Sequence, residues 1–295
     1  MHLFKDLTRL AASLGSVLGG AALSLGLAGQ TLAQTLPFIG EPHPGGIALQ
    51  EAHSPVAVES HWIDHMLMYI SAGITIFVCA LLLWVLVRYN RRLNPTPSRF
   101  THNSPLEVAW TILPIFVLIF IGAFTVPALF NDQTMPEADV TIKVTGYQWY
   151  WGYEYVDNGV EFASYLLQPD ELAEHGYEPR HYLLATDTQV VVPVGRNVVM
   201  QVTGADVIHS WALPAFGVKQ DAVPGRLAQL WFNVDEPGIY FGQCSELCGQ
   251  GHAYMPIVIR AVPEAEYTAW LQEQGATNLA AFAPAEAAPV ALASN

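Results

Sequence analysis

Four side chains that bind soft or intermediate metals lie within one short stretch of this chain: Cys244, Cys248, His252 and Met255. Thiol, imidazole and thioether ligands in one place suit copper better than magnesium or calcium. A single-copper electron-transfer site uses one Cys, two His and a weak Met, whereas this stretch holds two Cys. Because each of two thiolates can bridge two metal ions, the stretch is equipped to bind a pair of coppers. His209 is the upstream candidate for the second imidazole.

Other interpretations of the stretch stay open. A disulfide between Cys244 and Cys248 suits a protein outside the cytoplasm, but it leaves His252 and Met255 without a role. Structural zinc rarely uses Met, and the paired CxxC spacing is absent. A single copper ion and a chance cluster are further alternatives. His209, taken alone, could be a core histidine whose ring nitrogens are hydrogen-bonded.

Two segments are long enough to cross a bilayer. Met66–Val87 and Val108–Phe130 contain no charged residue and run for 22 and 23 residues. Four basic residues lie in the loop at 88–107, and no Lys or Arg occurs from residue 34 to residue 87. The positive-inside rule therefore places this loop in the cytoplasm and both ends of the hairpin outside. A buried hairpin of a soluble protein would instead alternate polar and apolar faces.

Residues 1–33 are typical of a secretory signal. Lys5 and Arg9 precede a long apolar stretch, and Thr31-Leu32-Ala33 offers a cleavage site before Gln34. An uncleaved anchor is the alternative. We expect an extended periplasmic segment over 34–60, the helical hairpin over 61–130, a periplasmic domain over 131–274 and a disordered tail over 275–295.

From Asp139 onward, short β-rich runs alternate with turns, and a helix is predicted over Pro263–Gln274. Short strands at this spacing indicate a sandwich or barrel. The fold class predicted is a two-helix transmembrane hairpin plus an all-β, cupredoxin-like Greek-key sandwich. The predicted strands are Val140–Gly146, Tyr182–Ala185, Gln189–Val194, Asn197–Thr203, Val207–Leu213, Leu227–Val234, Ile239–Gln243 and Ile257–Val262.

The composition limits the partners. With 52% hydrophobic and 13% charged residues, the chain of 295 residues is too apolar for an ordinary soluble protein. Its formal net charge of -14 excludes nucleic acid as a natural partner and favours a basic protein.

The metal-ligand stretch resembles the binuclear copper (CuA) loop in subunit II of haem-copper cytochrome c oxidases of the proteobacterial and mitochondrial type. The resemblance covers roughly residues 60–272. The matching segments outside the loop are Gly146–Trp151, Val207–Trp211, Lys219–Arg226 and Tyr240–Cys244.

The resemblance implies a complete ligand set for two copper ions. Cys244 and Cys248 would bridge the metals, and each copper would bind one imidazole, from His209 or His252. The weak ligands would be Met255 and the backbone carbonyl of Glu246. The Glu246 side chain would help to bind a magnesium ion shared with subunit I, although a solvated loop acid is the alternative.

The resemblance also assigns roles outside the copper loop. Trp149 would be the point where electrons enter from cytochrome c, although the aromatic cluster around it also reads as sandwich core. Strand alternation would then place Trp149 on the same face as Trp151. Glu107 would be the entrance for protons taken up from the cytoplasm; an interfacial anchor is its alternative.

Three acids match positions that the family uses for docking cytochrome c: Glu154, Asp187 and Asp206. A further acidic position of that pattern is Ala163 here. Acids kept merely for solubility are the alternative for each.

The function implied is that of subunit II in the bacterial inner membrane. Electrons would pass from cytochrome c through the copper pair to the haem groups of subunit I, where oxygen is reduced to water and protons are pumped, with subunit III as a further partner. The chain itself shows no oxygen-reducing centre. A quinol oxidase subunit II would usually lack the copper ligands, and a copper-delivery protein would keep open, exchangeable sites.

Overall fold

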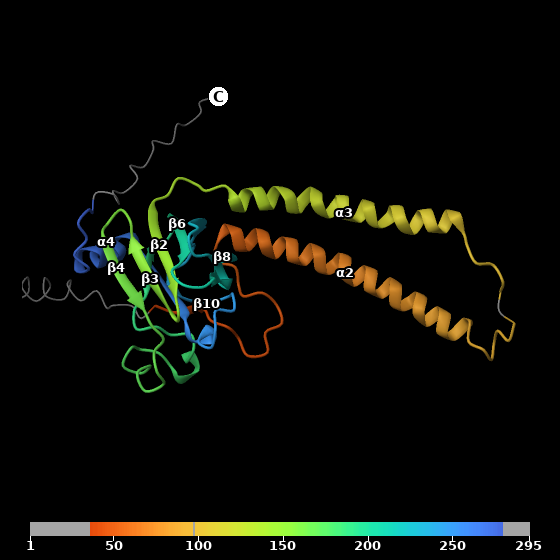
Figure 1. Cartoon of the computed structure of the whole chain (residues 1–295), viewed down its shortest axis with the longest axis horizontal. Coiled ribbons are helices and arrows are strands. Elements are labelled where there is room, and N and C mark those ends of the chain that lie inside the picture. The colour runs from red at the N-terminus through yellow and green to blue at the C-terminus, as the bar shows by residue number, and fades with distance from the viewer. Residues whose placement is uncertain (1–35, 97, 280–295) are drawn as a thin grey trace, which may run out of the picture. The chain divides into compact units, whose positions relative to one another are not determined.

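The computed structural model describes residues 36–96 and 98–279, so the predicted signal and most of the predicted tail lie outside the described residues. Two long helices, α2 (Pro55–Arg88) and α3 (Ser104–Gln133), lie side by side (Figure 1). Their most apolar windows have mean hydropathies of 2.6 and 2.5, which suffices to cross a membrane by length and composition. The predicted helical hairpin is confirmed.

Capping residues set where each helix begins. The Ser54 hydroxyl accepts a hydrogen bond from the N–H of Ala57, and Pro55 occupies the first turn, where its missing N–H costs nothing. α2 therefore starts at Pro55, so the prediction of an extended segment up to residue 60 is wrong for its last six residues. At α3, the Asn103 side chain accepts from Leu106 N–H and the Glu107 carboxylate accepts from Asn103 N–H, a reciprocal capping box.

The rest of the described chain forms two sheets packed as a sandwich. One sheet has the order β5-β11-β10-β7-β8, with β1 added to β10, and the other has the order β4-β3-β2-β6-β9. Strands of the first sheet are β1 (Phe38–Gly40), β5 (Val190–Pro193), β7 (His209–Leu213), β8 (Val218–Ala222), β10 (Gly238–Cys244) and β11 (Pro256–Val262). Those of the second are β2 (Val140–Tyr147), β3 (Tyr150–Tyr155), β4 (Val160–Ser164), β6 (Asn197–Gly204) and β9 (Ala228–Asn233).

Alternation of buried and half-buried side chains along the strands builds the core between the sheets. Ile142 and Val144 of β2 are fully buried, as are Trp211 of β7 and Phe232 of β9, whose rings stack at 6.2 Å. Each fully buried side chain of this size contributes roughly 1.5–3 kcal/mol.

Several sequence-based assignments differ from the structure. The segment Tyr182–Ala185, predicted as a strand, is a turn that follows a 3-10 helix (Pro179–His181), and Leu183 there has a φ of 71°. β1, β3, β4 and β8 were not predicted, the last because its centre is the polar run Lys219-Gln220-Asp221. The C-terminal helix α4 (Glu264–Glu273) matches its prediction closely.

Candidate metal centre

Neighbouring strands deliver the predicted ligands to one end of the first sheet. β10 ends at Cys244 and β11 begins after Met255, so the loop between them carries three further ligands. In the ladder between β10 and β7, Cys244 lies opposite Trp211. His209 is the first residue of β7. The loop is fixed to β7 beyond the sheet, because Ser245 N–H donates to the Ser210 carbonyl at 2.9 Å.

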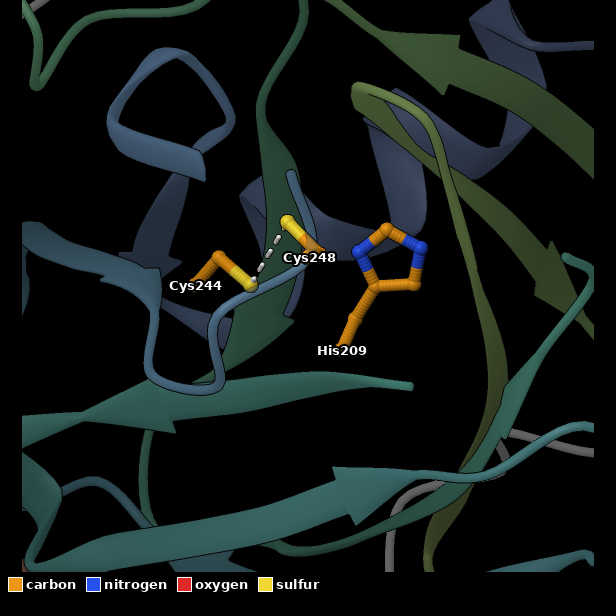
Figure 2. Close-up of side chains that lie close together, drawn as sticks. All are labelled: His209, Cys244 and Cys248. Carbon is orange, nitrogen blue, oxygen red and sulfur yellow. Dashed lines mark hydrogen bonds between the residues drawn. The ribbon is translucent and has the colours of Figure 1, made fainter. Parts of the chain in front are cut away.

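The five predicted side-chain ligands converge. The two thiol sulfurs lie 3.8 Å apart, too far for a disulfide bond, and both cysteines are free and buried. Figure 2 shows the two sulfurs facing each other with the His209 ring beside them, and the ligand atoms of these three residues lie within 4.8 Å of one another. From Cys248 Sγ, His252 Nδ1 is 3.7 Å away and Met255 Sδ is 3.6 Å away.

The two nitrogens of His209 have different surroundings. Its side chain is completely buried, and Nε2 lies 2.9 Å from Asp206 Oδ1, whereas Nδ1 is buried without a hydrogen-bond partner among the described residues. A buried polar atom without a partner is costly unless something else satisfies it. A carboxylate that accepts from one ring nitrogen leaves the other free for a metal. These residues therefore fit a soft or intermediate metal ion.

The thiols titrate as a pair. Burial opposes ionisation of Cys244, but the neighbouring His209 imidazole and hydrogen bonds with the backbone of Glu246 and Ser210 outweigh it and lower the thiol's pKa. Burial and the neighbouring Cys244 raise the pKa of Cys248. One thiol therefore loses its proton well before the other, and a bound metal cation would displace the second proton.

Trp149 lies directly over the ligand loop. It sits in the turn between β2 and β3, and its indole N–H donates to the Cys248 carbonyl at 3.1 Å. The Gln148 side chain donates to the same carbonyl at 3.0 Å. A Cβ on Gly251 would lie 2.3 Å from the Trp149 ring, so only glycine allows this contact. Trp149 is half-buried, and because it lies in a turn, the prediction that it shares a strand with Trp151 was wrong.

Trp151 serves the core. It is fully buried, and its indole N–H donates to the Met255 carbonyl at 3.1 Å. The turn and the strand that follows it thus fix both ends of the 248–255 segment.

The three acids predicted to dock a partner have different surroundings. Asp206 accepts from the N–H groups of Gln148 and Val207 at 2.8 and 2.6 Å, in addition to its contact with His209. Asp187 accepts from Tyr165 N–H at 2.8 Å and is exposed. Glu154 is ion-paired with Lys143 at 2.8 Å, which neutralises part of its charge.

The two other acids with predicted roles are Glu246 and Glu107. Glu246 is exposed, and its backbone carbonyl lies 3.3 Å from Cys244 Sγ, near the thiolates as expected of a weak ligand. Glu107 caps α3 and is half-buried.

Sequence reasoning missed the part that Gln148 and Asp206 play in holding the site. A carboxylate three residues before a candidate His ligand was the available signal, because metal-binding imidazoles usually donate their second N–H to such a group.

Two family models match most of the chain. The periplasmic domain of cytochrome c oxidase subunit II matches residues 140–262, and the transmembrane domain of the same subunit matches residues 42–127. Cytochrome c oxidase subunit 2 of Cereibacter sphaeroides is 53% identical over 94% of this chain and 97% of its own length. The probable subunit 2 of Rickettsia bellii is 41% identical over 83% of this chain and 90% of its own. The crystal structure of the periplasmic domain of subunit II of Bradyrhizobium japonicum cytochrome oxidase shares 50% identity, covers 48% of this chain and 97% of that one, and has a TM-score of 0.44.

Proposed function

This chain belongs to the cytochrome c oxidase subunit II family, and from that premise we propose that it accepts single electrons from cytochrome c at a pair of copper ions. The electrons then pass to the haem groups of subunit I, where oxygen is reduced to water and protons are pumped. The chain catalyses this reaction only as a subunit of that complex.

The convergence of two free thiols, a buried imidazole nitrogen without a partner, a second imidazole and a thioether carries the proposal. The copper ligands we propose are His209, Cys244, Cys248, His252, Met255 and the backbone carbonyl of Glu246. Two copper ions held by these residues would supply one-electron chemistry with little change in structure between oxidation states. The chain's own residues hold this cage rigid through the contacts of Ser245, Trp151 and Asp206.

On the donor side, Trp149 is the residue through which electrons enter. Its ring lies in the turn between β2 and β3 and donates one hydrogen bond to the Cys248 carbonyl. An electron that reaches Trp149 from a partner at this turn is therefore one hydrogen bond from a proposed copper ligand. Asp187, Asp206 and Glu154 attract a basic partner toward this turn, because an acidic face speeds encounter at low ionic strength.

On the acceptor side, the carboxylate of Glu246 is exposed and would help to bind a magnesium ion shared with subunit I. We assign Glu107 to the uptake of protons at the cytoplasmic end of α3, where it also caps the helix. Subunit III is a further partner.

We place the chain in the bacterial inner membrane. α2 and α3 are apolar enough to span it, and the basic residues that join them keep their loop in the cytoplasm. The sandwich and its copper site then lie in the periplasm, as a secretory signal over residues 1–33 requires.

Copper stoichiometry and electron paramagnetic resonance of the full chain in detergent test the proposal. We expect two coppers per chain that share one unpaired electron. A single-copper spectrum, or no copper uptake with Cys244 and Cys248 in a disulfide, would refute it. Rapid loss of all copper to a weak chelator would favour a delivery protein instead.

A further inference from the structure

A hollow with a volume of about 640 Å³ lies where the first turns of α2 meet the sandwich, and none of the proposed copper ligands lines it. Val58, Glu59 and Trp62 of α2 line it together with Ser54, the residue that caps this helix, and Asp235 comes from the loop after β9. None of these residues has a part in the proposed electron transfer.

The walls of this hollow are fixed by contacts from three elements. The Ser54 hydroxyl donates to the Phe216 carbonyl at 2.6 Å, which ties the start of α2 to the sandwich. The Trp62 ring packs edge to face on Phe124 of α3 with centroids 5.3 Å apart. Val58 and Trp62 nevertheless remain 58% and 51% exposed, so the hollow presents an apolar surface to its surroundings.

The charge at this surface has one sign. The lining holds the carboxylates of Glu59 and Asp235 and no Lys or Arg. The Asp235 side chain is 61% exposed, and its Oδ1 lies 3.3 Å from His53 Nδ1. Glu59 accepts only a long hydrogen bond, 3.4 Å, from the Asn131 amide. The hollow therefore attracts a cationic group and repels an anionic one.

The depth of the hollow agrees with that of lipid headgroups. The apolar span is predicted to begin at Met66, and α2 continues without a break back to Pro55. At about 1.5 Å per residue, Trp62 lies about 6 Å and Glu59 about 10 Å beyond the edge of the hydrocarbon. Polar headgroups occupy roughly 5–8 Å on each side of a bilayer, so Trp62 lies within this layer, where Trp is enriched. Glu59 lies just beyond it on the water side, where the terminal ammonium of a headgroup extends.

From the acidic rim, the exposed indole and this depth, we propose that the hollow binds a phospholipid with an ammonium headgroup, phosphatidylethanolamine or phosphatidylcholine. The ammonium lies between Glu59 and Asp235 and over the Trp62 ring, where cation–π attraction adds to the charge pairing. The acyl chains follow the apolar surface of α2 and α3 toward the membrane interior.

Lipid binding to the full chain tests this. The chain is stripped of lipid in detergent and titrated with phosphatidylethanolamine or phosphatidylglycerol of the same acyl chains, and native mass spectrometry counts the bound lipid. We expect at least fivefold preference for phosphatidylethanolamine. Glu59→Gln and Trp62→Leu should each weaken its binding about three- to tenfold, while the matched control Asp64→Asn, an acid of the same helix outside the lining, should not.

Equal affinity for both lipids, or variants that bind like the control, would overturn the proposal. Copper content of the same variants distinguishes this outcome from misfolding or from failure of the electron-transfer proposal. In the assembled complex, benzoylphenylalanine at position 58 should crosslink to lipid on illumination. A crosslink to another subunit would show that protein covers the hollow, and would also refute the inference.

Discussion

Replacing Asp206 by Asn would remove the charge that links the Trp149 turn to His209, a proposed copper ligand, with almost no change in size. The carboxylate receives hydrogen bonds from the N–H groups of Gln148 and Val207 and contacts His209 Nε2 at 2.9 Å. An Asn side chain accepts through one oxygen and donates through its other end. At least one of the three groups therefore faces a donor instead of an acceptor.

The expected loss follows from these contacts. Hydrogen bonds to charged groups contribute about 1.5–3 kcal/mol, and solvent screening at a side chain that is 35% exposed reduces this. We expect Asp206→Asn to lower the free energy of unfolding by about 1–2 kcal/mol, or the melting temperature by roughly 3–6 °C. Because His209 also loses the negative charge of the carboxylate that orients its ring, we expect copper affinity to fall about 10- to 100-fold.

Thermal melting and copper titration against a competing chelator measure the two effects on the full chain. Asp170→Asn is the control, because it removes the same charge from an exposed acid in the loop after β4. The reasoning is refuted if Asp206→Asn binds copper as tightly as the control does. A lower melting temperature with unchanged copper affinity would mean that Asp206 holds only the turn and does not orient His209.

Three further changes probe other parts of the molecule. Gly251→Ala places a methyl group against the Trp149 ring, so we expect it to lower the free energy of unfolding by about 1–3 kcal/mol, measured by thermal melting, and to slow the reduction of the copper site by cytochrome c, measured by stopped flow. Unchanged tryptophan fluorescence would contradict the displacement of Trp149. The bond from Lys219 holds the pKa of Asp221 below its ordinary value of 3.8, so the stability it contributes is present above about pH 4 and is lost as pH falls through the lowered pKa. The difference in melting temperature between wild type and Asp221→Asn should therefore be constant above about pH 4 and shrink as pH falls below that value; a difference that does not change with pH would refute this. Asp187→Asn should raise the KM for cytochrome c at low salt and have little effect at high salt, and a salt-independent change would exclude steering.

The convergence of the candidate ligands was easier to predict from the sequence than the strands were. Cys244, Cys248, His252 and Met255 lie within one loop, so their shared chemistry is visible without knowledge of the fold. The hairpin was equally readable, because uncharged runs of that length have few other uses.

What the sequence concealed depends on partners distant along the chain. β8 is polar at its centre and is held as a strand by pairing with β7, and Tyr182–Ala185 carries strand-like residues but follows a helical turn that redirects the backbone. The contact from Trp149 to Cys248 joins residues 99 positions apart, and no local pattern announces it.

The pairing of β1 limits how many times the chain can cross the membrane. Its residues pair in parallel with β10, Phe38 with Ile239 and Gly40 with Tyr240, so the first described strand closes a sheet whose neighbour is made about two hundred residues later. Between the two partners run α2 and α3. Strands joined by a hydrogen-bonded ladder must lie on one side of any membrane, so the chain between them crosses it an even number of times or not at all. The ladder and the basic loop therefore both require an even number of membrane crossings. A chain that inserted only one of its two helices could not pair β1 with β10, the strand that ends at Cys244.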